Sequence, residues 1–548
     1  MEVSTAPGRG ATAEHRGPPP WKLAATCAVV AAVVATVLVV FGPAGGDRAA
    51  HDYQRWLFRE HGLTLWNNYW YAGRYSFVTY SVLYYPVVAA VGIGATAIAS
   101  VSAAAGAYAI LVARRWGTGA RLSAYAFAVV WAAAVLGAAF PFLLGATFAI
   151  VALAVADARG RAPWAFPLLS GATLATSPVA FVLLAICVAA VAVARWRRPA
   201  WGMAVPIAVL ATLEVLMWRA FPDSGRYPFA TSDVLYVTVF CCMGLALARR
   251  VPGGRLLRSF FGVYLAAGAV AFLVPSPLGG NIVRLRLAAL PIAVLVLTLR
   301  RWRPLLPSAA ALVATGIWTL TPAVGAFTHA DAQVSAAVSY WAPVVTFLEP
   351  RLRPGQRVEV VDTEGHWGAV YLPQAGIPLV RGWFRQQDFP TNALLYEGRL
   401  DAAEYRAWLD RLAVAFVVVP HAAPDYSSRR EAELVRSGTS GLRRVARVGA
   451  HVVYAVPSPA PLARGPGSAR VLTFAHDELS VAIDRPGRYD LALRYTPYWR
   501  PSAGCIERGQ DGLAVLDAAT AGIHLLRFAP SPDRVVEVVV GGGARSCA

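Results

Sequence analysis

The chain has 548 residues, of which 57% are hydrophobic and only 15% charged, and its formal net charge is +19. Soluble domains carry roughly 25% charged residues, so this composition indicates an integral membrane protein and excludes an ordinary soluble enzyme. Residues 1–321 hold 26 Lys and Arg against nine Asp and Glu, whereas residues 322–548 hold 24 against 22. Because the basic excess falls between apolar segments, it is typical of the positive-inside rule and argues against nucleic-acid binding.

The apolar segments predict a polytopic α-helical membrane domain over residues 21–321. Residues 1–20 are predicted to be a disordered cytoplasmic tail, and an outer loop is predicted at 42–78. The long run 79–113, interrupted by glycines, predicts a membrane-dipping segment followed by one crossing. About eleven spans are predicted in all, each near the ~20 residues that a crossing needs: 21–41, the second part of 79–113, 122–139, 142–157, 163–176, 178–194, 201–218, 232–248, 259–274, 287–299 and 305–321.

With this arrangement, 18 of the basic residues of the membrane domain fall on one side and eight on the other. The heavier side is predicted to be cytoplasmic. The chain is therefore expected to be a multi-pass protein of a bacterial plasma membrane. Its N-terminus would be cytoplasmic, and everything after residue 321 would be extracytoplasmic.

Two extracytoplasmic domains are predicted. Residues 322–460 predict an α/β domain, with helices at 339–352 and 401–412 and buried strands at 357–365, 413–420 and 451–456. Residues 461–548 predict a small β-sandwich, with strands within 470–483, 487–499, 522–530 and 534–540. Cys505 and Cys547 lie in this last region. Two alternatives stay open: the two residues form a disulfide, or both remain free thiols.

Two acids follow the first span closely. A reaction that deprotonates a hydroxyl outside the membrane needs a carboxylate held near the membrane surface. Asp52 is the preferred candidate, because it follows the anchoring span and precedes an aromatic-rich segment. Asp47 is nearer the membrane and could do the same work. The alternative for either is a solvated loop acid.

Arginines at outer membrane boundaries are candidates for binding a phosphate. PSPLGGNIVRLR (275–286) contributes Asn281, Arg284 and Arg286, and YAGRY contributes Arg74. The arginine side chain suits bidentate phosphate contacts. The alternative is that these side chains extend to lipid headgroups.

Residues 65–86 read LWNNYWYAGRYSFVTYSVLYYP and interleave aromatics with amides. Aromatic rings stack on sugar faces while amides pair with hydroxyls, so a sugar-binding cleft is predicted here, although an interfacial aromatic belt is the alternative. The candidates are Trp66, Asn67, Asn68, Tyr69 and Trp70.

An acid shortly after the first span, followed by residues 65–86, resembles the first outer loop of the GT-C superfamily of integral membrane glycosyltransferases. It is most similar to the branch with a 6-pyruvoyl-tetrahydropterin-synthase-related domain. ATSPVAF (175–181) resembles the helix break of such proteins, and EGHWGAVYLP (364–373) and RGWFRQQDF (381–389) resemble segments of their outer domain.

The resemblance implies a polyprenyl-phosphate-linked sugar donor and an extracytoplasmic glycan, lipid or protein acceptor. It gives Asp52 the role of base and Arg284 or Arg286 that of holding the donor phosphate, with His51 tuning Asp52 or binding substrate. Where many members have paired acids this chain has His51–Asp52, so no cofactor is certain and a divalent metal stays open. The remaining candidates could face the cleft or could be polar loops of the outer domain: Glu364, His366, Trp383, Gln386 and Asp388.

The competing function is a non-catalytic transporter or envelope assembly factor for lipid-linked precursors. Such a protein would carry several charged residues deep in its spans, and the sequence offers almost only Glu214. A third reading is an accessory protein whose β-sandwich binds a cell-wall glycan.

Overall fold

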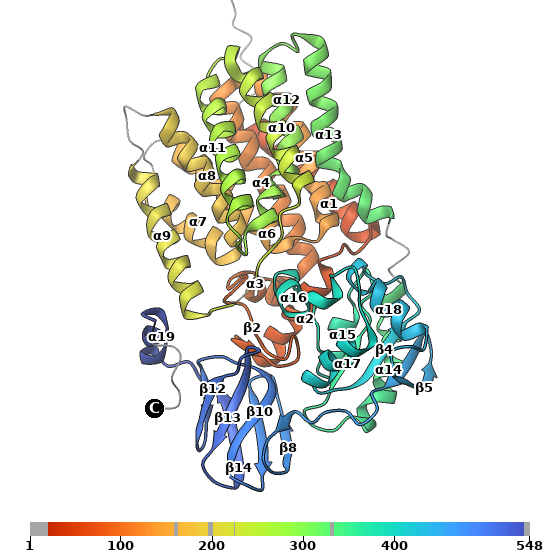
Figure 1. Ribbon diagram of the computed structural model, residues 1–548. Helices are drawn as coiled ribbons and strands as arrows, with labels where there is room; N and C mark the ends of the chain where they lie inside the picture. The colour runs from red at the N-terminus through yellow and green to blue at the C-terminus, as the bar shows by residue number, and fades with distance from the viewer. Residues whose placement is uncertain (1–19, 158–162, 196–200, 224, 329–333, 542–548) are drawn as a thin grey trace, which may run out of the picture.

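The computed structural model describes residues 20–157, 163–195, 201–223, 225–328 and 334–541. Figure 1 shows a bundle of helices with two strand-bearing domains packed against one of its ends. The short helices and strands of residues 42–92 lie between the bundle and these domains. The predicted tail, residues 1–20, lies outside the described residues except for Pro20.

The bundle contains the apolar helices that the sequence predicts, so this part of the fold class is confirmed. Eight segments of the described chain are long and apolar enough to cross a membrane; one of them, Ile93–Gly137, contains two helices, and two further apolar helices are shorter. The helices are α1 (Pro20–Phe41), α4 (Ile93–Trp116), α5 (Arg121–Ala133), α6 (Phe140–Asp157), α7 (Ala165–Thr176), α8 (Pro178–Ala194), α9 (Trp201–Ala220), α10 (Thr231–Leu247), α11 (Gly254–Leu273), α12 (Arg286–Leu299) and α13 (Leu305–Thr328).

The long apolar run after the first outer segment is in two pieces, as predicted. A short helix, α3 (Tyr84–Val91), ends at Gly92, and α4 begins directly after it. Gly92 has φ +93°, a conformation that glycine adopts without steric cost. The break lets α3 lie at the end of the bundle while α4 runs through it.

The two ends of the bundle differ in charge. At the end away from the strand-bearing domains, the Arg115 side chain lies 3.6 Å from Asp157, Arg114 donates to the Ala154 carbonyl and Arg300 to the Leu247 carbonyl. The opposite end carries the candidate residues Asp47 and Arg284. This asymmetry is the basis of the predicted orientation, in which the arginine-rich end is cytoplasmic.

The segment expected to be a loop, residues 42–78, contains a helix, α2 (Arg48–His61), and a two-stranded hairpin of β1 (Trp66–Asn67) and β2 (Arg74–Tyr75). The loop prediction is therefore wrong for residues 48–61. Ala49, Tyr53 and Leu57 recur every four residues, and all three are fully buried. This spacing places them on one face of a helix, a signal that the charged residues between them masked.

The α/β domain is built on a four-stranded sheet of order β3-β4-β6-β5, formed by β3 (Arg357–Val360), β4 (Val414–Pro420), β6 (His451–Ala455) and β5 (Arg443–Val448). β3 and β4 are parallel, and the other pairs are antiparallel. The three predicted strands are present. Both predicted helices are also present, as α14 (Val338–Leu348) and α17 (Ala402–Arg411), with α15 (Gly368–Gln374), α16 (Arg385–Thr391) and α18 (Arg429–Arg436) around the sheet.

The predicted β-sandwich is confirmed as two four-stranded sheets. Their orders are β12-β13-β10-β7 and β11-β14-β9-β8. The strands are β7 (Ala463–Arg464), β8 (Ala469–Phe474), β9 (Glu478–Ile483), β10 (Gly487–Arg494), β11 (Trp499–Pro501), β12 (Cys505–Arg508), β13 (Leu513–Ala518) and β14 (Gly522–Phe528). Cys505 is disulfide-bonded, and Cys547 lies outside the described residues.

The last expected strand, residues 534–540, is instead a helix, α19 (Pro532–Val539), so that prediction is wrong. The β-branched residues suggested a strand, but Ser531 accepts a hydrogen bond from the Arg534 N–H and Pro532 occupies the first helical turn. Both are strong helix-start signals. α19 packs against α9, and this contact stabilises the helix in place of a sheet partner.

Candidate active site

Three cavities meet around Asn281 and Arg284, on the short 3-10 helix η4 (Gly279–Leu285) at the domain-facing end of the bundle. We call them the central cavity (≈ 260 Å³), which faces the α/β domain, the α8–α9 cavity (≈ 420 Å³) and the α5–α13 cavity (≈ 220 Å³). Gly279 has φ +38° and packs against the Tyr227 carbonyl, which holds η4 against the 221–230 segment.

Asp47 faces this junction. It lies directly before α2, lines both the central and the α5–α13 cavities, and its carboxylate is 3.8 Å from the Arg284 guanidinium. About a third of its side chain, 34%, is exposed, which leaves it accessible from the cavities. Burial raises the pKa of Asp47, while Arg284, His366 and Arg385 act in the opposite direction. A carboxylate with a raised pKa is suited to accept a proton.

Asp52 lies on another side of α2. Its carboxylate accepts a hydrogen bond from Arg48 Nε at 2.8 Å, a pair one helical turn apart. Asp52 lines none of the three cavities at this junction. Residues four apart share a helix face, so Asp47 and His51 point the same way while Asp52 is turned away from them.

His51 lines the central cavity among aromatic rings. Its Nδ1 lies 3.2 Å from the Tyr85 hydroxyl, and its ring contacts Tyr80, Tyr84 and Phe140. Burial, with the nearby Arg284 and Arg48, lowers the pKa of His51 to about 3. The imidazole is therefore neutral at pH 7, and it can orient a neighbour or bind a hydroxyl without adding charge.

The three candidate phosphate-binding arginines occupy different places. Arg284 lines all three cavities, and its Nε donates to Asn281 Oδ1 at 3.3 Å. Arg286 lines only the α5–α13 cavity of the three. Arg74 is only 4% exposed and lines the central cavity; its guanidinium lies 4.0 Å from the Phe384 ring centroid, and its Nε has no hydrogen-bond partner.

Most of the aromatic segment joins domains. Asn67 donates to the Tyr53 hydroxyl (3.0 Å) and accepts from the Tyr69 N–H (2.9 Å). Asn68 donates to the Ala475 carbonyl of the β-sandwich (2.8 Å) and accepts from Trp66 Nε1 (2.7 Å). These amides are thus occupied by protein groups. Asn67, Asn68 and Tyr69 line none of the cavities described here.

The same segment also anchors the α/β domain. Trp70 Nε1 donates to the Ala369 carbonyl at 3.0 Å, and the Tyr71 hydroxyl to the Gly382 carbonyl at 2.8 Å. A side chain at Gly382 would collide with the Trp70 ring. Of the five predicted sugar-binding residues, Trp70 is the one that lines the central cavity. Residues 66–75 therefore act as a wedge between the bundle and the two outer domains.

Residues 381–389 bring the α/β domain to the cavity. Trp383 and Gln386 line the central cavity, and Trp383 Nε1 donates to the Gly46 carbonyl, next to Asp47, at 2.8 Å. The His366 ring stacks on Trp383 with 3.6 Å between centroids. Trp383 therefore ties the α/β domain to the segment that carries the candidate base.

The other α/β candidates lie deeper. Asp388 is buried and binds Arg381 through both carboxylate oxygens, at 3.2 and 2.7 Å. His366 lies 3.4 Å from Asp362 and 3.6 Å from Asp425. Burial alone would lower the pKa of His366, but these two carboxylates outweigh it and raise that pKa. Asp388 and His366 stabilise the segment behind the cavity, and Glu364 does not line it.

Sequence reasoning missed several residues that line the central cavity, among them Arg385 and Tyr227. Arg385 binds Asp425 at 2.7 Å and packs on the Trp383 ring at 4.7 Å. Its signal was available, because it is the neighbour of Gln386 in the segment already singled out. Tyr227 comes from the 221–230 segment, whose place beside η4 depends on helix packing that no local pattern encodes.

A metal-ligand set is not evident: in the described ranges no three His, Cys, Asp or Glu side chains are grouped so that they could hold a metal ion. The described residues therefore identify no ligands for a divalent metal, whose presence the sequence analysis left undecided.

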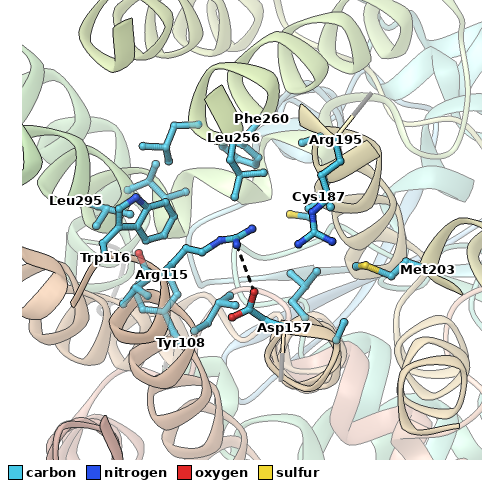
Figure 2. Close-up of a pocket in the computed structure, with 18 residues that line it drawn as sticks. Tyr108, Arg115, Trp116, Asp157, Cys187, Arg195, Met203, Leu256, Phe260 and Leu295 are labelled. Atoms are coloured by element: carbon cyan, nitrogen blue, oxygen red, sulfur yellow. Dashed lines mark ion pairs between the residues drawn. The ribbon is translucent and has the colours of Figure 1, made fainter. Parts of the chain in front are cut away.

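A separate cavity of ≈ 200 Å³ lies at the arginine-rich end of the bundle. Figure 2 shows its walls, with Tyr108, Trp116, Phe260 and Leu295 around the Arg115–Asp157 pair. None of the predicted site residues lines it.

Comparisons with known proteins give a distant likeness. No family model matches the chain, and no curated protein matches it at a significant level. Among solved structures it is similar to the crystal structure of ArnT from Cupriavidus metallidurans bound to undecaprenyl phosphate. The sequence identity is 15%, the match covers 80% of this chain and 99% of that chain, and the TM-score is 0.38. A likeness of this size assigns no residue, reaction or ligand to this chain.

Proposed function

We propose that the protein is a membrane glycosyltransferase that moves a sugar from a polyprenyl-phosphate donor to an extracytoplasmic acceptor. The observation that carries the proposal is the Asp47–Arg284 pair. It lies where the central cavity, the more polar of the two, meets the largely apolar α8–α9 cavity. A lipid-linked sugar has the same division into an apolar chain, a phosphate and a polar head. The resemblance of residues 65–86 to GT-C enzymes points the same way.

The donor is assigned to the α8–α9 cavity and the junction. Val179, Val182 and Trp218 contribute apolar walls at the end of the bundle, where the polyprenyl chain would pack. Arg284 and Asn281 stand where this cavity joins the central one, and would bind the phosphate. The sugar would then project into the central cavity toward Asp47.

The reaction assigns the base role to Asp47. Its carboxylate takes the proton of an acceptor hydroxyl, whose oxygen forms a bond to the anomeric carbon as the bond from that carbon to the donor phosphate oxygen breaks. The phosphate leaves with the electron pair, and Arg284 stabilises its developing charge. The neutral His51 orients the sugar or Tyr85 and moves no proton.

The transporter alternative gains no support. Glu214, the acid expected to mark a translocation path, lies on α9 and lines none of the cavities described here. α9 itself is largely exposed toward the predicted lipid phase. A translocation path through the bundle would need charged groups on helices that face one another.

The test is a pair of isosteric variants five residues apart. Purified protein in nanodiscs is first screened with a panel of polyprenyl-phosphate sugars for the donor that raises its apparent Tm. With that donor, Asp47→Asn should lower the transfer rate roughly 10²–10⁴-fold, the usual contribution of a general base. Asp52→Asn is the control and should stay near wild type, with donor-induced stabilisation kept in both. Full activity of Asp47→Asn together with loss in Asp52→Asn would move the base to Asp52, and stabilisation by no donor would contradict the proposal.

A further inference from the structure

A second large cavity lies farther from the membrane bundle, between the aromatic segment, the α/β domain and the β-sandwich. Its volume is ≈ 680 Å³, the largest of those described here, and we call it the outer cavity. We propose that it binds an anionic stretch of the acceptor glycan, one that carries carboxylate or phosphate groups. The inference rests on the proposed function, since it assigns this ligand as the acceptor.

The charge of the outer cavity is strongly one-sided. Its two acids are Asp223 and Asp511. Against them stand five arginines from four separate parts of the chain: Arg74, Arg219, Arg411, Arg494 and Arg508. A cavity lined by one sign of charge attracts ligands of the opposite sign, and arginine is the side chain suited to carboxylate and phosphate.

The floor of the outer cavity holds two arginines with unused donors. Arg494 and Arg74 each have a buried Nε that lacks a hydrogen-bond partner, and Arg74 is almost completely buried. Arg494 donates to Thr391 Oγ1 at 2.8 Å. The Gln387 amide lies between Arg494 and Asp223, and the orientation in which its nitrogen donates to Asp223 and its oxygen accepts from Arg494 satisfies both. Both Nε atoms are buried away from the cavity surface, so a bound anion would act on these two cations through its charge. It would contact the exposed side chains of Arg411 and Arg508 directly.

The outer cavity adjoins the candidate active site. Arg74 lines both the outer and the central cavities, and Asp223 lines both the outer and the α8–α9 cavities. A glycan held by the outer arginines could therefore place a hydroxyl past Arg74, toward Asp47. The donor would enter by a separate route, through the α8–α9 cavity.

The walls favour a glycan over a lipid headgroup. They come mainly from the two outer domains, including the turn between β12 and β13 through Arg508 and Gly512. Trp66, Tyr71 and Tyr75 lie behind this surface, buried against other protein groups. The volume is within the range of sites that enclose a ligand larger than one small ion.

The experiment measures binding to full-length protein in phosphatidylcholine nanodiscs by fluorescence anisotropy. The probes are labelled tetragalacturonate and a labelled phosphorylated oligomannose, with neutral maltotetraose as the reference. At least one anionic probe should bind roughly tenfold or more tightly than maltotetraose, and raising the salt concentration should weaken it. If neither anionic probe binds better than maltotetraose, the proposal is wrong.

The variant is Arg411→Gln/Arg508→Gln, which removes two exposed rim charges and leaves the buried floor intact. It should weaken the anionic probe roughly tenfold or more, because charge-assisted hydrogen bonds are lost. Arg470→Gln, an exposed arginine of the other sandwich sheet, is the matched control and should bind as wild type. An equal effect of the variant and the control would overturn the site.

Two further arms separate the possible failures. Asp47→Asn does not touch the outer cavity and should bind the anionic probe normally while transfer is lost, so binding can be judged even if the proposed reaction is wrong. Nanodiscs of phosphatidylglycerol should bind the probe as phosphatidylcholine nanodiscs do. If phosphatidylglycerol displaces the probe in wild type and not in the rim variant, the occupant is a lipid headgroup and the glycan assignment fails.

Discussion

In the α/β domain, four acidic side chains and two serine hydroxyls surround the Arg381 guanidinium. Beside the cavities, by contrast, Arg74 and Arg494 each have a buried Nε without a hydrogen-bond partner among the described residues. The Arg381 carboxylates are at 2.7 to 4.0 Å and come from Glu359, Asp362, Asp388 and Glu431. Both regions are rich in buried charge, but only the first satisfies its central cation with its own side chains.

The difference separates structural charge from charge that is available to a ligand. A buried cation persists when several partners surround it, because its desolvation is then offset within the protein. Arg381 fixes residues 381–388, and this segment carries Trp383 and Arg385 to the central cavity. Arg74 and Arg494 are not surrounded by described carboxylates in this way, and both line cavities.

The largest expected effect comes from removing Arg381, the centre of the paired cluster that it forms with Glu359, Asp362, Asp388 and Glu431. Arg381→Met should destabilise the fold by about 3–5 kcal/mol, because the Asp388 carboxylate, which it binds through both oxygens, and the other buried acids lose their counter-charge. Denaturant unfolding monitored in the α/β domain measures it. The control is Arg430→Met, whose ion pair with Glu433 is largely exposed and should cost at most about 1 kcal/mol. Equal losses in the two variants would remove the distinction between the paired cluster and a surface pair.

A smaller and different effect is expected at the cavity. Arg284→Gln should raise the KM for the polyprenyl-phosphate donor roughly 10–100-fold, the loss of charge-assisted hydrogen bonds worth about 1.5–3 kcal/mol, with little change in Tm. Arg284 opposes the rise in the pKa of Asp47, so its removal should raise that pKa further. The rising, low-pH limb of the pH–rate profile, which reports ionisation of the base, should therefore move to higher pH. Arg59→Gln, an exposed arginine at the end of α2, is the control. An unchanged KM would exclude Arg284 from the donor site.

The smallest effect tests the free-energy cost of ionising a buried carboxyl, Glu431, within the paired cluster. Burial raises the pKa of Glu431 to about 7, although Arg381 and the Tyr405 hydroxyl act against the rise. A carboxyl with a raised folded-state pKa contributes stability that is fully present below its unfolded pKa of about 4.5 and is lost as pH rises through about 7.

Glu431→Gln keeps an acceptor for Tyr405 and cannot ionise. The Tm of this variant, relative to wild type, should therefore increase between pH 4.5 and 7, by on the order of 2–4 °C. Glu433→Gln, on the exposed side of the same helix, should show no such trend. A difference in Tm that stays constant with pH would show that Glu431 does not titrate in this range.

The amino-acid sequence predicted the apolar helices, the break at Gly92, the charge asymmetry of the bundle, three of the four α/β sheet strands and the sandwich. These follow from hydropathy, β-branched runs and turn residues, which act over a few residues. It also singled out the correct neighbourhood, since Asp47, His51, Arg74, Asn281, Arg284, Trp383 and Gln386 all line one cavity.

Which of these residues face a common space depends on the tertiary structure. Asp47 and Asp52 are alike in sequence, but the pitch of α2 turns one toward Arg284 and pairs the other with Arg48. Asn67 and Asn68 look like sugar ligands until their partners, a tyrosine of α2 and a carbonyl of the β-sandwich, are seen. α19 became a helix through its cap and its contact with α9. For Asp47, Asn68 and the α19–α9 contact the deciding partner is distant in the chain, and local patterns carry no information about it.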